Sequence, residues 1–163
     1  MTGLSDKYGD RLFQHVSRCY GFEQTDLGPG LTSELIRDKD GRISRTLKKY
    51  LWDYGLDREL QEGIDDLEAF WTHEGIPSRD LLLHNIVVQM ADEKVIRLVV
   101  IDGLGSAGVV PEQVLPSFWG NRKARRKIKN FHSRIESFLG QRGHGEFPGF
   151  HGLLLHDGRE EQK

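Results

Sequence analysis

Apolar residues recur at helical spacing in three stretches of the chain, which predicts three amphipathic helices. The first covers residues 47–54, and Asp57 is placed to cap a second helix that ends at Gly75. The third covers residues 117–139. The apolar positions that define them are Leu47, Tyr50, Leu51 and Tyr54 in the first, Leu60, Ile64, Leu67 and Trp71 in the second, and Trp119, Ile128, Phe131, Ile135 and Phe138 in the third.

Short β-rich runs in two other regions predict two hairpins. Residues 16–25 and 31–37 flank residues 26–30, which are rich in turn-forming types. Residues 86–88 and 96–101 form the second pair, separated by a mostly polar connection. Helices and antiparallel hairpins that follow one another in this way indicate an α+β fold.

The length of 163 residues and the 37% hydrophobic content fit one globular domain. We expect this domain to cover residues 1–139 and the glycine-rich residues 140–163 to form a flexible tail. The chain has no apolar run long enough to cross a bilayer and no apolar signal core at residues 1–10. Because Cys19 is alone, a disulfide framework is excluded, and we expect a cytoplasmic protein.

Basic residues are concentrated in one part of a chain whose net charge is −2. Six of the 23 lysines and arginines fall within residues 122–129, so the rest of the chain has 17 basic residues against 25 acidic ones. This distribution argues against a general attraction to nucleic acid or to a membrane, but it leaves room for one local anion-binding surface. Its candidates are Arg122, Lys123, Arg125 and Arg126, and the alternative is an ordinary solvated helix face.

Polar residues whose presence core packing does not explain lie at the ends of the second predicted hairpin. Arg79, Asp80 and Asn85 precede its first strand, and Asp102 follows its second strand. Carboxylate, amide and phosphate oxygens are the ligands that Mg²⁺ prefers. A hairpin that presents Asp80, Asn85 and Asp102 on one side therefore predicts a magnesium site.

The spacing of these residues also fits phosphoryl transfer. In that chemistry a loop aspartate orients the acceptor hydroxyl, an asparagine after four intervening residues holds a metal ion, and an aspartate at the end of a strand holds the metal on the phosphates. Asp80, Asn85 and the Asp102-Gly103 pair follow this pattern. The alternative is that the three side chains only cap turns, which these residue types often do.

Five motifs between residues 16 and 139 resemble the PhoP regulatory network proteins of the YrbL type, small bacterial members of the protein-kinase-like superfamily. The motifs are Arg18-Cys-Tyr-Gly-Phe-Glu, Arg37-Asp-Lys-Asp-Gly, Asn85-Ile-Val-Val, Val100-Ile-Asp-Gly-Leu-Gly and Trp119-Gly-Asn-Arg-Lys-Ala-Arg-Arg. The resemblance implies a protein-kinase-like fold in which residues 42–139 form a reduced C-lobe. Residues 16–37 would then be a truncated N-lobe, a two-strand hairpin followed by the hinge.

The resemblance also implies ATP and Mg²⁺ as cofactors and gives each candidate residue a role. Asp80 would be the catalytic base, with Arg79 bracing its loop, while Asn85 and Asp102 would hold the metal. The implied nucleotide contacts are Ser33 at the gatekeeper position and the backbone near Glu34 and Ile36.

The chain departs from kinases because no glycine-rich phosphate loop, strand lysine or partner helix is evident. Without them the phosphates lose positively charged contacts, and water is not excluded from the site. Three hypotheses follow: a Mg-ATP phosphotransferase of unknown acceptor, a catalytically inactive kinase-like binding or regulatory protein, and polyanion binding through residues 122–129. In the first case, a partner protein or a dimer could complete the N-lobe.

Overall fold

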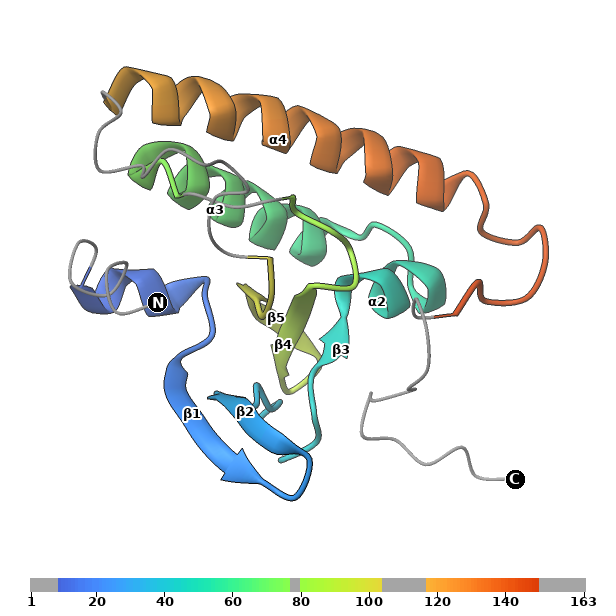
Figure 1. Ribbon diagram of the computed structural model, residues 1–163. Helices are drawn as coiled ribbons and strands as arrows, with labels where there is room; N and C mark the ends of the chain where they lie inside the picture. The colour runs from blue at the N-terminus through green and yellow to red at the C-terminus, as the bar shows by residue number, and fades with distance from the viewer. Residues whose placement is uncertain (1–8, 77–79, 104–116, 150–163) are drawn as a thin grey trace, which may run out of the picture.

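The computed structural model describes residues 9–76, 80–103 and 117–149, and it describes the backbone alone for residues 117–124. Within these ranges the architecture is mixed α+β (Figure 1). In chain order the elements are the 3₁₀ helix η1 (Gly9–Gln14), β1 (Cys19–Thr25), β2 (Gly28–Ser33), β3 (Arg45–Thr46), α2 (Leu47–Asp53), α3 (Arg58–Glu74), β4 (Ile86–Ala91), β5 (Lys94–Val100) and α4 (Ser117–Leu139). The predicted hairpins and helices are therefore present.

The centre of the molecule is an antiparallel sheet in the order β3–β4–β5. Side chains alternate between its two faces, as strand geometry requires. Ile86, Val88 and Leu98 belong to the main core, which they share with the helices. Val87 and Val99 point the other way and form a small separate cluster with Ile36.

The β4–β5 hairpin is longer than the sequence predicted because its polar residues also pair. Gln89 lies opposite Arg97, and Ala91 lies opposite Lys94. The strands are joined by Asp92 and Glu93 alone, which have φ values of 48° and 69°. Positive φ values at both loop residues are typical of the tight turn that matches the twist of two antiparallel strands.

Helix α3 covers the sheet and lies close to β5. Asp57 caps its first turn, with Oδ1 accepting from the backbone N–H of Leu60 at 2.7 Å. The helix ends at Gly75, which has a left-handed conformation. Gly63 faces β5, and a β-carbon there would lie 2.6 Å from Cδ1 of Leu98. This glycine therefore allows the close approach of the helix to the strand.

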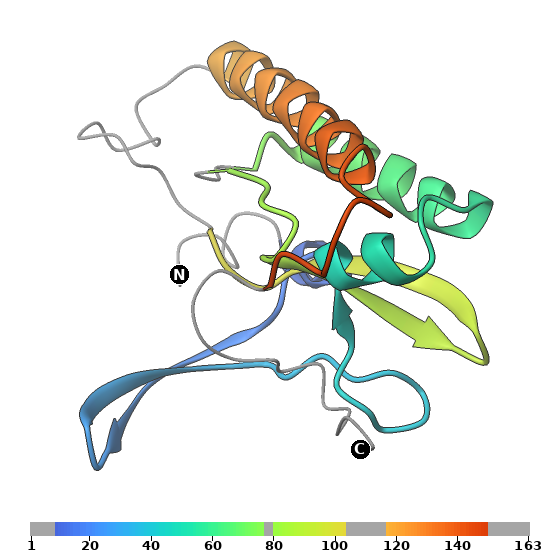
Figure 2. The same ribbon diagram turned by 90° about the vertical axis from the view of Figure 1, so that its right-hand side faces the viewer.

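Helix α4 lies along α3 on the side away from the sheet, in both views of the molecule (Figures 1 and 2). Phe131, Ile135 and Phe138 are buried and belong to the main core. His132 Nε2 also contacts the carboxylate of Glu68 on α3. Burial raises the pKa of Glu68, and the charge of His132 opposes this shift. The part of α4 after residue 124 is thus held by both apolar and polar contacts.

The β1–β2 hairpin projects from the rest of the protein (Figure 2). Its second strand starts at Gly28, earlier than predicted, because the turn contains two residues and Gly28 pairs with Thr25. Pro29 is accommodated because a two-stranded ribbon leaves one side of each strand unpaired. Phe22 and Leu31 lie opposite each other and are 75% and 56% exposed. The hairpin thus carries an uncovered apolar face.

The chain that follows α4 returns to α2. Arg142 donates hydrogen bonds to the backbone carbonyls of Trp52 and Asp53, at 2.7 Å and 2.9 Å. The ammonium group of Lys48 donates to the carbonyl of Gly149, and burial lowers the pKa of this lysine. The first part of the predicted tail therefore contacts the domain, and the rest lies outside the described residues.

Candidate functional site

The loop that carries Asp80 is fixed on its apolar side. Leu81 and Leu83 are buried in the main core. The backbone N–H of Lys48, in α2, donates to the carbonyl of Leu83 at 3.0 Å. Asn85 closes a turn by donating its backbone N–H to the carbonyl of Leu82 at 2.9 Å. The loop therefore has a defined path between Asp80 and Asn85, which directly precedes β4.

The end of β5 lies beside this loop. The backbone N–H of Ile101 donates to the carbonyl of Asn85 at 2.9 Å. On the other side of β5, Val100 exchanges backbone hydrogen bonds with His15 and Ser17, which extend the sheet in parallel. The strand is therefore held on both edges immediately before Asp102.

The turn at Gly103, directly after Asp102, lies against the loop between Asp80 and Asn85. Gly103 has a φ of +83°, a conformation that favours glycine. A β-carbon at this position would lie 3.3 Å from the backbone oxygen of Asp80 and 3.4 Å from Nδ2 of Asn85. The exposed carboxylate of Asp102 uses Oδ1 to accept from the N–H of Gly103 at 2.6 Å. The chain after β5 thus folds onto the Asp80–Asn85 loop.

The chemistry of this donor set fits a magnesium ion that also binds phosphate. Mg²⁺ is usually held by one or two carboxylates together with substrate phosphates and water. Asp102 and the side-chain amide of Asn85 would supply the protein ligands. In the described ranges, no three His, Cys, Asp or Glu side chains gather closely enough to hold a metal ion. A bound ion would therefore depend on ligands from a second molecule, such as nucleotide phosphates.

Asp80 is held by a residue that the sequence interpretation missed. Arg134 of α4 donates from Nη2 to Oδ2 of Asp80 at 3.0 Å. The two residues are 54 positions apart. Arg134 occupies a helical position next to the buried Phe131, Ile135 and Phe138. A charged residue that borders the apolar face of an amphipathic helix is the sequence signal that could have singled it out.

The expected nucleotide contacts lie where the β1–β2 hairpin joins the rest of the chain. Ser33 ends β2 and is exposed. Glu34 donates its N–H to the carbonyl of Arg18 at 2.8 Å, and its Oε2 accepts from the N–H of Arg18 at 3.0 Å. Ile36 is buried, and its carbonyl accepts from the N–H of Ser44 at 3.0 Å.

The remaining candidates are only partly described. Arg79 lies outside the described residues, as do the side chains of Arg122 and Lys123. Arg125 and Arg126 are exposed on α4. The anion-binding role of these four basic residues therefore stays a prediction.

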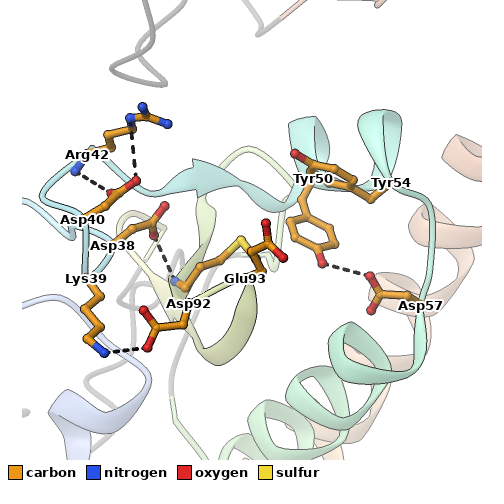
Figure 3. A pocket seen from close by; sticks show the side chains of 10 residues that line it. Asp38, Lys39, Asp40, Arg42, Tyr50, Tyr54, Asp57, Asp92 and Glu93 are labelled. Carbon is orange, nitrogen blue, oxygen red and sulfur yellow. Dashed lines mark hydrogen bonds and ion pairs between the residues drawn. The ribbon is translucent and has the colours of Figure 1, made fainter.

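A separate pocket of about 800 Å³ lies at the other end of the β4–β5 hairpin (Figure 3). In this view Asp38 is on one side, Tyr50 and Asp57 are on the other, and Glu93 lies between them. Tyr50 donates from its hydroxyl to Asp57 at 2.8 Å, and burial is the main cause that raises the pKa of Tyr50. The lining residues are Asp38, Lys39, Asp40, Arg42, Tyr50, Tyr54, Asp57, Met90, Asp92 and Glu93. None of them is among the candidate site residues that the sequence predicted.

The described chain is thus a small α+β protein in which Asp80 and Asn85 precede β4 and Asp102 follows β5. The family model "PhoP regulatory network protein YrbL" matches residues 4–136, and the chain belongs to this family. Among curated proteins and among solved structures, nothing matches the chain. None of the helices in the described ranges has the length and apolar character needed to span a membrane.

Proposed function

We propose that this protein binds Mg-ATP through a reduced kinase-like fold and transfers its terminal phosphoryl group to an acceptor. One observation carries the proposal. Asp102 directly precedes Gly103, where a β-carbon would lie 3.3 Å from the backbone oxygen of Asp80 and 3.4 Å from Nδ2 of Asn85. In phosphoryl transfer, an aspartate that orients the acceptor, an asparagine and a second aspartate have these relative positions along a loop and two strands.

The metal would lie between the protein and the phosphates. Asp102 has an exposed carboxylate, and its Oδ2 accepts no hydrogen bond within the described part of the chain. This oxygen and the amide oxygen of Asn85 would bind Mg²⁺, and phosphate oxygens would complete its coordination. The metal would orient the phosphates and neutralise the charge that develops during transfer.

The adenine would lie beside the chain between Ser33 and Ile36. An adenine base offers an amino donor and ring-nitrogen acceptors. The carbonyl of Glu34 and the N–H of Ile36 have no backbone partner within the described ranges, whereas the N–H of Glu34 and the carbonyl of Ile36 are both used. The carbonyl of Glu34 is an acceptor and the N–H of Ile36 is a donor, as the base requires.

A second chain that packs on the β1–β2 hairpin would complete the reduced N-lobe. Phe22 and Leu31 form an exposed apolar pair on the projecting β1–β2 hairpin, and a hairpin alone is marginally stable in water. A partner protein or a second copy that covers this face would also exclude water from the nucleotide. The acceptor would bind at the Asp80 carboxylate, which would orient its hydroxyl group.

Calorimetry with ATP, in the presence and absence of Mg²⁺, tests the proposal. We expect binding that requires Mg²⁺ and that weakens at least about tenfold, or about 1.4 kcal/mol, in Asp102→Asn. Asp92→Asn is the matched control because it changes an exposed aspartate at the far end of the same hairpin. Asn is also tolerated at its positive φ.

The variants separate the proposed activity from other outcomes. Asp80→Asn should bind Mg-ATP like the wild type but lose transfer. Binding without transfer in the wild type would identify a catalytically inactive nucleotide-binding protein. No binding at millimolar ATP, or equal loss in Asp92→Asn and Asp102→Asn, would contradict the proposed site.

A further inference from the structure

Arg134 joins the C-terminal helix to the proposed site. Helix α4 is fixed against the core by Phe131, Ile135 and Phe138, which are 0%, 3% and 7% exposed. Arg134 extends from this fixed backbone, and its Nη2 lies 3.0 Å from Oδ2 of Asp80. The position of the Asp80 carboxylate is therefore set partly by an element that follows the nucleotide-binding residues in the chain.

This ion pair is poorly suited to a purely stabilising role. The Arg134 and Asp80 side chains are 32% and 41% exposed, and ion pairs in such surroundings contribute little to folding because water screens them. In addition, Nη1 of Arg134 is buried and donates no hydrogen bond within the described residues. A buried donor without an acceptor opposes folding. Stability alone does not account for an arginine at this half-buried position beside the apolar face of α4.

A functional role follows from the oxygens that surround the pair. Asp102 directly precedes Gly103, which lies against the backbone oxygen of Asp80 and the side-chain amide of Asn85. A dication among them would attract both carboxylates, although only Asp102 serves as its ligand in the proposed function. Arg134 balances the charge of Asp80 and occupies its Oδ2. The other oxygen, Oδ1, accepts no hydrogen bond within the described residues and stays available to an acceptor hydroxyl.

We propose that Arg134 is a positioning residue that holds Asp80 away from the metal and directs its carboxylate toward the acceptor. This inference rests on the proposed function. It predicts that loss of Arg134 frees Asp80 to bind the metal ion. Metal affinity would then rise while turnover falls, a combination that a merely structural role would not produce.

Two measurements test this role on the full chain. The first is Mn²⁺ binding, followed by electron paramagnetic resonance in the presence of ATP. Arg134→Gln should bind Mn²⁺ more tightly than the wild type, and the double variant Arg134→Gln/Asp80→Asn should return to the wild-type affinity. Arg58→Gln is the matched control, because Arg58 is an exposed arginine on α3 that also pairs with a carboxylate, that of Glu62.

The second measurement is phosphate release from Mg-ATP, with water as the acceptor. A misplaced catalytic group commonly lowers a rate by about 100-fold, so we expect Arg134→Gln to lose about 10- to 100-fold in rate while its affinity for Mg-ATP does not fall. Arg134→Lys, which keeps the charge, should recover part of the rate. Thermal unfolding of each variant identifies loss of the fold.

The outcomes separate this inference from the proposed function. If the wild type does not bind Mg-ATP, the proposed function fails. If the wild type binds Mg-ATP but Arg134→Gln leaves both Mn²⁺ affinity and phosphate release unchanged, only the role of Arg134 is overturned. Parallel loss of rate, nucleotide affinity and thermal stability in Arg134→Gln would show a structural residue and would overturn the inference as well. A wild type that binds Mg-ATP but releases no phosphate would also overturn the inference.

Discussion

Replacing Gly103 by alanine perturbs the proposed site at the point where its parts meet. The substitution adds one β-carbon, which would lie 3.3 Å from the backbone oxygen of Asp80 and 3.4 Å from Nδ2 of Asn85. The contact with Asp80 is tight, so this neighbour would have to move by roughly a few tenths of an ångström. The φ of +83° also disfavours alanine, by about 1–2 kcal/mol.

The expected effect on nucleotide binding follows from the contacts of the added β-carbon and from the unfavourable φ. If the turn relieves the strain by moving Asp102 away from Asn85, the metal site loses about 1–2 kcal/mol, which corresponds to about 5- to 30-fold in affinity. Calorimetry with Mg-ATP measures this loss, and chemical denaturation measures the accompanying change in the free energy of unfolding.

Gly143→Ala provides the matched control. Gly143 has a φ of +85°, and a β-carbon there would meet nothing within 4 Å. It should therefore show a similar backbone strain but retain Mg-ATP binding. Wild-type affinity in Gly103→Ala, or an equal loss of affinity in Gly143→Ala, would refute the view that the close approach at Gly103 builds the site.

Three substitutions away from the site test the account of the fold. Gly63→Val should lower the free energy of unfolding by about 2 kcal/mol in a urea titration, because the new side chain would meet Leu98 on β5; an unchanged midpoint would contradict this packing. Asp57→Ala should cost about 1 kcal/mol in the same titration through loss of the α3 cap to Leu60, and a loss well below that would show that the cap is weak. Burial lowers the pKa of His15 below its ordinary 6.5, so the unfolded chain binds the proton more readily and stability should fall as pH drops through 6.5 toward the lower folded-state pKa. His15→Gln should remove this part of the acid dependence, and an identical pH profile of stability would contradict it.

Periodicity was sufficient to predict most of the regular structure. The third predicted helix has the same limits as α4, and Asp57 caps α3 as its residue type and position indicated. The hairpins were harder to delimit because turn-forming residues also pair in strands. Gly28 begins β2 although it follows a turn, and Gln89 lies in β4 although it is polar. Residue type alone does not show which backbone groups find a partner across a ribbon.

The candidate site was partly accessible from sequence because its residues flank strands that are close in the chain. The backbone bond from Ile101 to Asn85 follows from extending the β4–β5 register by one residue. The contact between Arg134 and Asp80 joins positions 54 residues apart and depends on how α4 packs. The acidic pocket that contains Asp38 and Glu93 is likewise formed by separate segments. Such contacts are set by tertiary packing and have no local sequence pattern.

The central claim is that a metal–nucleotide complex binds at the ends of β4 and β5 near Asn85 and Asp102. Paramagnetic broadening of backbone amide signals by Mn²⁺ and ATP tests this location directly, because the effect decreases steeply with distance from the ion. The account predicts that the signals of Asn85, Asp102 and Gly103 broaden first, while those of Asp92 and Glu93 at the other end of the hairpin remain sharp. Broadening centred on Asp92 and Glu93, beside the acidic pocket, would contradict the proposed site.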